Sequence, residues 1–135
     1  MKRRGTFLLI LVVIASFAIW GVYALPKHLV GIHQSAVTQE LAQWKDEYSV
    51  VDSHASAVRT AGMIEYVGNY YVPSEGYRGT PDTEKALETQ RQETIDAIVE
   101  ALCAYTKEDF GEDSEQWLEY LETAKPLPSS DDRQL

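Results

Sequence analysis

Residues 6–25 read TFLLILVVIASFAIWGVYAL, an uncharged and largely apolar run that closely follows Lys2, Arg3 and Arg4. A helix of this length rises about 30 Å, which matches the hydrocarbon core of a bilayer. A continuous helix also pairs its backbone polar groups internally, as lipid requires. The run therefore predicts a transmembrane helix. The side chains expected to anchor it are Phe7, Leu11, Ile14, Phe17, Trp20 and Tyr23.

A cleaved secretory signal is the alternative interpretation of this run. A signal combines a basic start with an apolar core of about 7–15 residues and a small-x-small cleavage site. The basic start is present, and Val22-Tyr23-Ala24 is a poor match for such a site. The run is longer than a signal core, however, and Trp20 and Tyr23 lie where aromatic rings suit the membrane–water interface. The sequence favours an uncleaved anchor.

The charges that flank the run predict its orientation. Three basic residues precede it, whereas only Lys27 follows it before Lys45. The positive-inside rule then keeps the N-terminus in the cytoplasm and exports the rest of the chain, to the periplasm or the cell exterior. The expected organisation is a cytoplasmic basic flank at 1–5, a single span at 6–25, an acidic helical domain at 26–124 and a disordered tail at 125–135.

The exported part is strongly acidic. It holds 9 of the 12 basic residues and all 21 acidic ones, so residues 26–135 carry a net charge of −12. Nucleic acid and anionic lipid surfaces are bound by clusters of Lys and Arg, and the charge opposes both as partners. The negative charge is compatible with a cationic protein partner. The single cysteine, Cys103, excludes a disulfide within the chain and is expected to pack as a small buried hydrophobe.

The segment from residue 29 to residue 51 has helical spacing. Leu41 and Tyr48 fill alternate positions of an apolar stripe, which Gln34 interrupts. We expect this stripe to dock on the rest of the domain; a homodimer through residues 30–51 is the alternative. The remaining members of the stripe recur every seventh residue: Val30, Val37, Trp44 and Val51.

A second helix is predicted over residues 55–67, which are rich in Ala and Gly. Asp52 or Ser53 would cap its first turn, because their side-chain oxygens accept hydrogen bonds from free backbone N–H groups. Gly68 and Asn69 would end it, since both tolerate the left-handed conformation. One continuous helix from residue 28 to about residue 70 is the alternative.

Two further helices follow an irregular stretch. Thr80 and Pro81 are typical of an N-cap and a first helical position, and this helix is expected to run to Tyr105. Its first half is polar, so only its second half is expected in the core. Asp113 and Gln116 predict a capping box for a short final helix. The residues expected in the core from the second half of the longer helix are Ile95, Ile98, Leu102 and Tyr105.

Residues 69–81, NYYVPSEGYRGTP, form the longest irregular stretch inside the domain. Its tyrosines either fold over the core and hydrogen-bond through their hydroxyls or form a contact surface with its arginine. Tyr and Arg are enriched where proteins bind one another. The candidate protein contacts are Trp44, Tyr70, Tyr71, Tyr77 and Arg78.

Residues 57–69 read AVRTAGMIEYVGN and, with residues 105–121, resemble a known type of helical unit. The later segment, which contains Asp109-Phe110-Gly111, is similar to the closing segment of some bacterial HEAT-like proteins. The resemblance covers residues 50–121 and implies a lone or degenerate unit, a scaffold or binding surface rather than an enzyme. The earlier segment resembles the second helix of a HEAT repeat at Val58-Arg59, Ala61, Ile64 and Gly68-Asn69.

The sequence contains no recognisable catalytic or metal-binding arrangement. His28 and His33 would lie about 140° apart on a helix, too far to share a metal ion. Asp52 and His54 form a two-ligand fragment without a third ligand. No nucleophile elbow, phosphate loop or dinucleotide fingerprint is present. We therefore expect no enzyme, cofactor or metal; a small metal-dependent hydrolase with a pocket around His54 is the last alternative.

These patterns predict an all-α protein, in which an N-terminal transmembrane helix precedes a small HEAT-like hairpin or bundle of three to four helices. The expected function is binding or scaffolding on the non-cytoplasmic side. The bilayer would bind residues 6–25, and an unidentified protein would bind the domain. A secreted soluble binding protein is the alternative if the N-terminal segment is cleaved.

Overall fold

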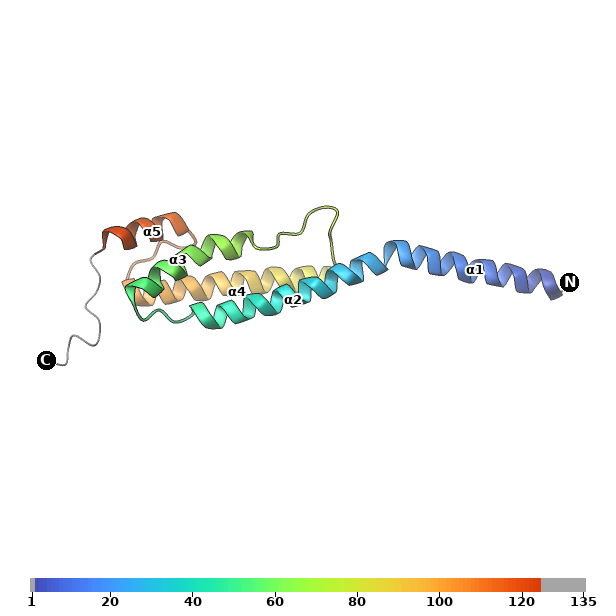
Figure 1. Ribbon diagram of the computed structural model, residues 1–135, viewed down its shortest axis with the longest axis horizontal. Coiled ribbons are helices and arrows are strands. Elements are labelled where there is room, and N and C mark those ends of the chain that lie inside the picture. Colours follow the sequence, from blue (N-terminus) through green and yellow to red (C-terminus); the bar gives the residue numbers. More distant parts are fainter. Residues whose placement is uncertain (1, 125–135) are drawn as a thin grey trace.

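The protein consists of five helices in a computed structural model that describes residues 2–124 (Figure 1). No strand occurs among these residues, so the all-α prediction is confirmed. The tail predicted at 125–135 lies outside the described residues. The helices are α1 Lys2–Tyr23, α2 Leu25–Tyr48, α3 His54–Asn69, α4 Pro81–Thr106 and α5 Ser114–Thr123.

The first two helices form an almost continuous rod. The backbone N–H of Ala24 donates to the Trp20 carbonyl at 2.8 Å, and that of His28 donates to the Ala24 carbonyl at 3.1 Å. The helical pattern is interrupted only at Ala24, because the neighbouring Pro26 lacks an N–H and disturbs the preceding turn. The helical run Gly5–Tyr48 contains the one described segment that is long and apolar enough to cross a membrane, and none of that segment is buried.

The exposure of α1 separates it from an ordinary core helix. Its large apolar side chains are exposed, and Figure 1 shows the helix extending away from the rest of the molecule. All six residues predicted as membrane anchors are exposed in this way. The N-terminal helix is therefore long and apolar enough to serve as a membrane span or a signal anchor.

Helices α2, α3 and α4 form a bundle in which α2 and α4 run parallel and α3 returns between them in sequence (Figure 1). The parallel direction is visible in the contacts: Gln34 meets Thr83, and eleven residues further along α2, Lys45 meets Glu93. The Thr94 hydroxyl donates to the Leu41 carbonyl at 3.0 Å. The core contains Val37, Leu41, Ala57, Ala61, Ile64, Val67, Leu87, Ile95, Ile98, Leu102, Trp117 and Leu121.

The apolar stripe of α2 is used within the chain. Val37 and Leu41 are buried, and Trp44 and Tyr48 pack against the same core. Gln34, which interrupts the stripe in the sequence, is itself buried and accepts a hydrogen bond from Thr83. Because the stripe is occupied within the chain, a homodimer through residues 30–51 would have to use the exposed faces of α2.

The alternative of one continuous helix over residues 28–70 is wrong, since α2 and α3 are separated after Ser49. Ser53 caps α3: its hydroxyl accepts the N–H of Ser56 at 3.2 Å, and the Ser56 hydroxyl accepts the N–H of Ser53 at 3.0 Å. This reciprocal capping favours a new helix start over continuation. The left-handed residue after α3 is Tyr71 (φ 48°), where the sequence suggested Gly68 or Asn69.

Helix α4 begins as predicted, with Thr80 as N-cap and Pro81 in the first turn, and ends before Lys107, which is left-handed (φ 68°). The expectation that only its second half enters the core is wrong. Leu87 is 1% exposed and Arg91 is 6% exposed. The reason is that α2 packs along the first half of α4 too, so the polar side chains there include buried, hydrogen-bonded ones.

Helix α5 begins at the predicted cap, but the capping box is only half formed. The Asp113 carboxylate accepts the N–H of Gln116 at 2.9 Å, while the Gln116 side chain donates back to that carboxylate at 2.7 Å instead of accepting a backbone N–H. Trp117 is fully buried and donates its indole N–H to the Gly111 carbonyl at 2.8 Å. The Ser114 hydroxyl joins α5 to α3 through the Ala61 carbonyl.

Candidate functional site

Three aromatic rings gather on the faces of α2 and α3. Trp44 lies 4.7 Å from Tyr70 and 5.4 Å from Tyr66, measured between ring centroids, and the two tyrosines lie 5.6 Å apart. The tilted and edge-on orientations are those that aromatic quadrupoles favour. Tyr66 is 52% exposed, whereas Trp44 and Tyr70 are half-buried. We call these three residues the aromatic cluster.

A carboxylate orients the cluster. The Tyr70 hydroxyl donates to Glu40 Oε2 at 2.7 Å, which joins the end of α3 to α2. This hydrogen bond, together with burial and the negative charge of Glu40, raises the pKa of the Tyr70 phenol above its ordinary value. The phenol therefore stays protonated at neutral pH and continues to donate.

The cluster borders a shallow groove of about 450 Å³. Its walls combine aromatic faces with the exposed carboxylate of Glu65 and the amide of Asn69. Such a surface offers flat apolar contact and negative charge side by side, which suits a basic and apolar ligand segment. The lining residues are Gly62, Glu65, Tyr66, Asn69, Tyr70 and Tyr71.

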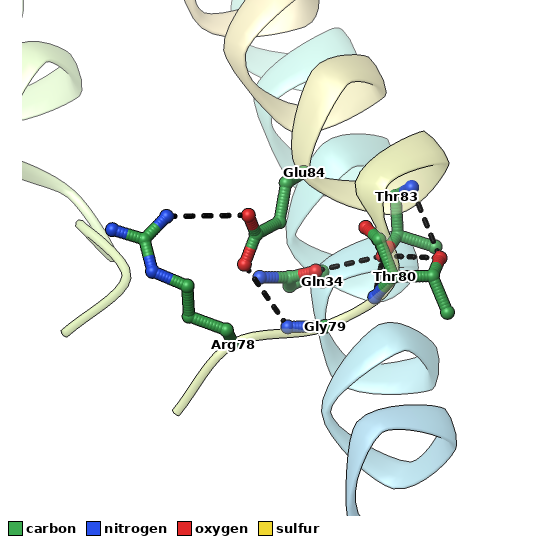
Figure 2. A network of polar contacts seen from close by, with 6 residues as sticks. All are labelled: Gln34, Arg78, Gly79, Thr80, Thr83 and Glu84. Carbon is green, nitrogen blue, oxygen red and sulfur yellow. Dashed lines mark hydrogen bonds and ion pairs between the residues drawn. The ribbon is translucent and has the colours of Figure 1, made fainter. Parts of the chain in front are cut away.

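The second half of the 69–81 loop is bonded to the start of α4, which is itself bonded to α2 (Figure 2). Glu84 accepts two hydrogen bonds, one from the Gly79 N–H at 3.1 Å and one from Arg78 Nη1 at 3.3 Å. The Thr83 hydroxyl donates to Gln34 Oε1 at 2.8 Å. These bonds position the loop near α2 and leave the loop side chains Tyr77 and Arg78 exposed.

A buried arginine holds the first half of the same loop. Arg91 Nη2 donates to the carbonyls of Tyr70 at 2.9 Å and Tyr71 at 3.1 Å, and Nη1 pairs with Glu88. The Tyr71 ring then lies edge-on against His33, with centroids 4.8 Å apart. The loop is thus held at both ends by polar contacts to α4.

The structure divides the predicted contact residues into two groups. Trp44 and Tyr70 belong to the aromatic cluster, with Tyr71 at its groove. Tyr77 and Arg78 lie apart from it, exposed on the loop. Sequence reasoning missed Tyr66, although its spacing of four from Tyr70 on a helix places both on one face.

Other polar groups do not converge in the same way. Within residues 2–124, no group of three or more His, Cys, Asp or Glu side chains is arranged to hold a metal ion. His54 opens α3, far in sequence from any acidic partner except Asp52. Cys103 is half-buried beside the core rather than fully buried, and burial raises the pKa of its thiol. A raised pKa lowers the fraction of reactive thiolate at neutral pH.

Comparisons of the chain with protein-family models, with curated proteins and with solved structures gave no match.

Proposed function

We propose that the protein is a single-pass, membrane-anchored binding module. In this proposal α1 spans the bilayer with its N-terminus in the cytoplasm, and the acidic bundle is exported and binds another protein at the membrane surface. The exposed apolar surface of α1 supports the anchor, and the basic residues before it support the orientation.

The aromatic cluster is the observation that carries the binding role. Tyr66 keeps half of its surface in solvent although it contacts two other rings. Large aromatic side chains in a groove are typical of the residues that dominate protein interfaces. With Glu65 in the groove and Glu40 beside it, the complementary partner is a basic segment with apolar side chains, whose cations would contact the ring faces.

The resemblance to a HEAT unit agrees with this role. Such units act as scaffolds that present helix faces. Helix α3 carries part of the resemblance and Tyr66 of the aromatic cluster, and Tyr70 follows it directly as C-cap. A lone unit gains affinity from its tether, because the anchor raises its concentration near any other membrane-bound protein.

A secreted form is the second candidate, and the joint between α1 and α2 favours it. The helical pattern breaks at Ala24, which is also where the small-x-small site would be cut. Cleavage would leave Leu25 as the first residue. Sequencing the N-terminus of the protein from cells decides between the two forms.

The binding proposal is tested by photo-crosslinking the full chain in native membranes. A photoreactive phenylalanine analogue replaces Tyr66 in one variant and the exposed Val50 in a control. The proposal predicts a discrete adduct from position 66 only, which disappears when Glu65→Lys reverses the charge of the groove. Equal adducts at both positions, or none at 66, would contradict it.

A further inference from the structure

Exposed apolar side chains continue beyond α1 into the first turns of α2. Leu25, Leu29 and Ile32 are all exposed, and their spacing of four and three places them on one face. The first buried residue of α2 is Gly31, where an added Cβ atom would lie 3.4 Å from the Thr83 side chain of α4. The bundle therefore begins only where this exposed apolar run ends.

The length of the exposed apolar run matches a whole bilayer. From Thr6 to Ile32 the helices rise about 40 Å at ~1.5 Å per residue. A hydrocarbon core is about 30 Å thick, and the headgroup regions extend the bilayer to about 40–45 Å. With α1 in the hydrocarbon, Leu29 and Ile32 therefore reach the outer headgroup region.

The 69–81 loop lies at the same level along the axis of α2. The Tyr71 ring contacts His33, and Gly79 lies so close to Gln34 that an added Cβ atom would be 2.1 Å from Gln34 Oε1. Both ends of the loop therefore meet α2 one or two residues after Ile32. Figure 1 shows the loop at the end of the bundle that is nearer to α1. Two of its large apolar side chains are exposed to solvent: Val72 is 62% exposed and Tyr77 is 69% exposed.

The end of the bundle nearer to α1 differs in charge from the rest of the part predicted to be exported. Residues 26–34 and 71–85 contain three basic side chains (Lys27, Arg78 and Lys85) and three acidic ones (Glu75, Asp82 and Glu84). They are neutral overall, so the whole net charge of −12 belongs to the remainder. An anionic lipid surface repels the remainder but not this end.

We propose that this end of the bundle, with Val72 and Tyr77 of the loop and Leu29 and Ile32 of α2, rests in the headgroup layer of the bilayer that α1 spans. The proposal rests on the proposed membrane anchor and assigns Tyr77 to lipid rather than to a protein partner. Tyrosine suits this layer because its ring is apolar and its hydroxyl is polar. The contact would fix the orientation of the bundle and hold the aromatic cluster at a constant height above the membrane.

Spin-label depth measurements on the full chain test this contact. The protein is placed in vesicles of phosphatidylcholine with a minor fraction of phosphatidylglycerol. In a Cys103→Ser background, single nitroxide labels are attached at Tyr77→Cys, at Ile14→Cys within α1, and at Val50→Cys at the far end of α2. Collision rates with oxygen, which concentrates in lipid, and with a water-soluble nickel chelate give the depth of each label.

The proposal predicts an intermediate depth for position 77, with a chelate collision rate several-fold below that at position 50. It is overturned if positions 77 and 50 are equally accessible to the chelate while position 14 is in lipid; the anchor then stands alone. Access of the chelate to position 14 would overturn the anchor and this contact together. As a second check, Tyr77→Asp should raise the chelate collision rate of a label at Val72→Cys, and an unchanged rate would contradict the contact.

Discussion

At the scale of single residues, Gly79 shows how tightly the loop is fitted to α2. A Cβ atom at this position would lie 2.1 Å from Gln34 Oε1 and 2.8 Å from Thr83 Oγ1. Gln34 is fully buried and accepts a hydrogen bond from Thr83, so moving its amide aside would break that bond. The absence of a side chain at residue 79 is therefore a requirement of the packing (Figure 2).

Gly79→Ala should destabilise the protein by about 1–3 kcal/mol, the usual cost of forcing an extra methyl group into a packed site. Chemical unfolding followed by circular dichroism measures this change. Gly76→Ala is the matched control, because a Cβ there meets nothing within 4 Å. Equal stability of the two variants would show that Gln34 has another conformation available.

Asp113 gives the fold an acid-sensitive cap. The backbone N–H of Gln116 and then its side chain bond to the carboxylate, and they lower the pKa of Asp113 below its ordinary value of 3.8. A carboxyl with a lowered pKa in the folded state stabilises the fold at pH values well above 3.8. This contribution is lost as the pH falls through the folded-state pKa.

Asp113→Asn should therefore flatten the loss of stability in acid, and it should lower the stability at neutral pH because the contribution of the charged carboxylate is gone. Asparagine also caps helices but does not titrate in this range. Thermal unfolding across the acid range measures how steeply the stability of the variant and of the parent falls with pH. Some dependence on pH should remain in the variant, because bonds from Ser56 and Ser53 also lower the pKa of Asp52. Identical slopes for the variant and the parent would refute the assignment.

At the scale of elements, the reciprocal cap of Ser53 and Ser56 separates α2 from α3. Ser53→Ala should cost about 0.5–2 kcal/mol, since it removes the acceptor for the first turn of α3. Ser74→Ala, in the exposed loop, is the control and should change stability very little. Denaturant unfolding compares the two, and amide hydrogen exchange of residues 54–57 should rise only in Ser53→Ala.

The helices that could be predicted from the sequence are those with a clear apolar periodicity or a clear cap. The apolar stripe predicted α2, which has no side-chain cap, and Thr80-Pro81 predicted the start of α4. The burial of Gln34 and Arg91 could not be predicted, because it depends on partners 49 residues away and on loop carbonyls. A polar residue enters a core when such partners satisfy it, and a single helix pattern does not contain them.

The candidate site was predictable only in part for a similar reason. Tyrosine density singled out the 69–81 loop, and Trp44 was included because of its place on the α2 stripe. The structure joins Trp44 and Tyr70 through Tyr66, which lies on α3 outside that loop. The composition of a segment cannot show which helix face meets it, so the third ring was missed.

At the scale of the whole molecule, the bundle is independent of α1. The first buried residue after α1 is Gly31, and none of the described core residues precedes Val37. A chain of residues 25–135 should therefore fold and unfold with a free energy within about 0.5 kcal/mol of the full chain, as for changes away from the core. Denaturant unfolding of both forms in the same mild detergent measures this difference. A large loss of stability would show that α1 packs on the bundle.

The same fragment isolates the contribution of the tether. Its aromatic cluster and groove are unchanged, so its intrinsic contacts with a partner should equal those of the full chain. Tethering alone raises apparent affinity by about 10²–10⁴-fold when both partners are held in one membrane. We therefore expect the photoreactive label at position 66 to form its adduct efficiently in the anchored chain, and about 10²-fold less efficiently in the soluble fragment at the same concentration. Equal adduct yields would mean that the groove binds its partner tightly without the membrane, and α1 would then serve export or positioning rather than affinity.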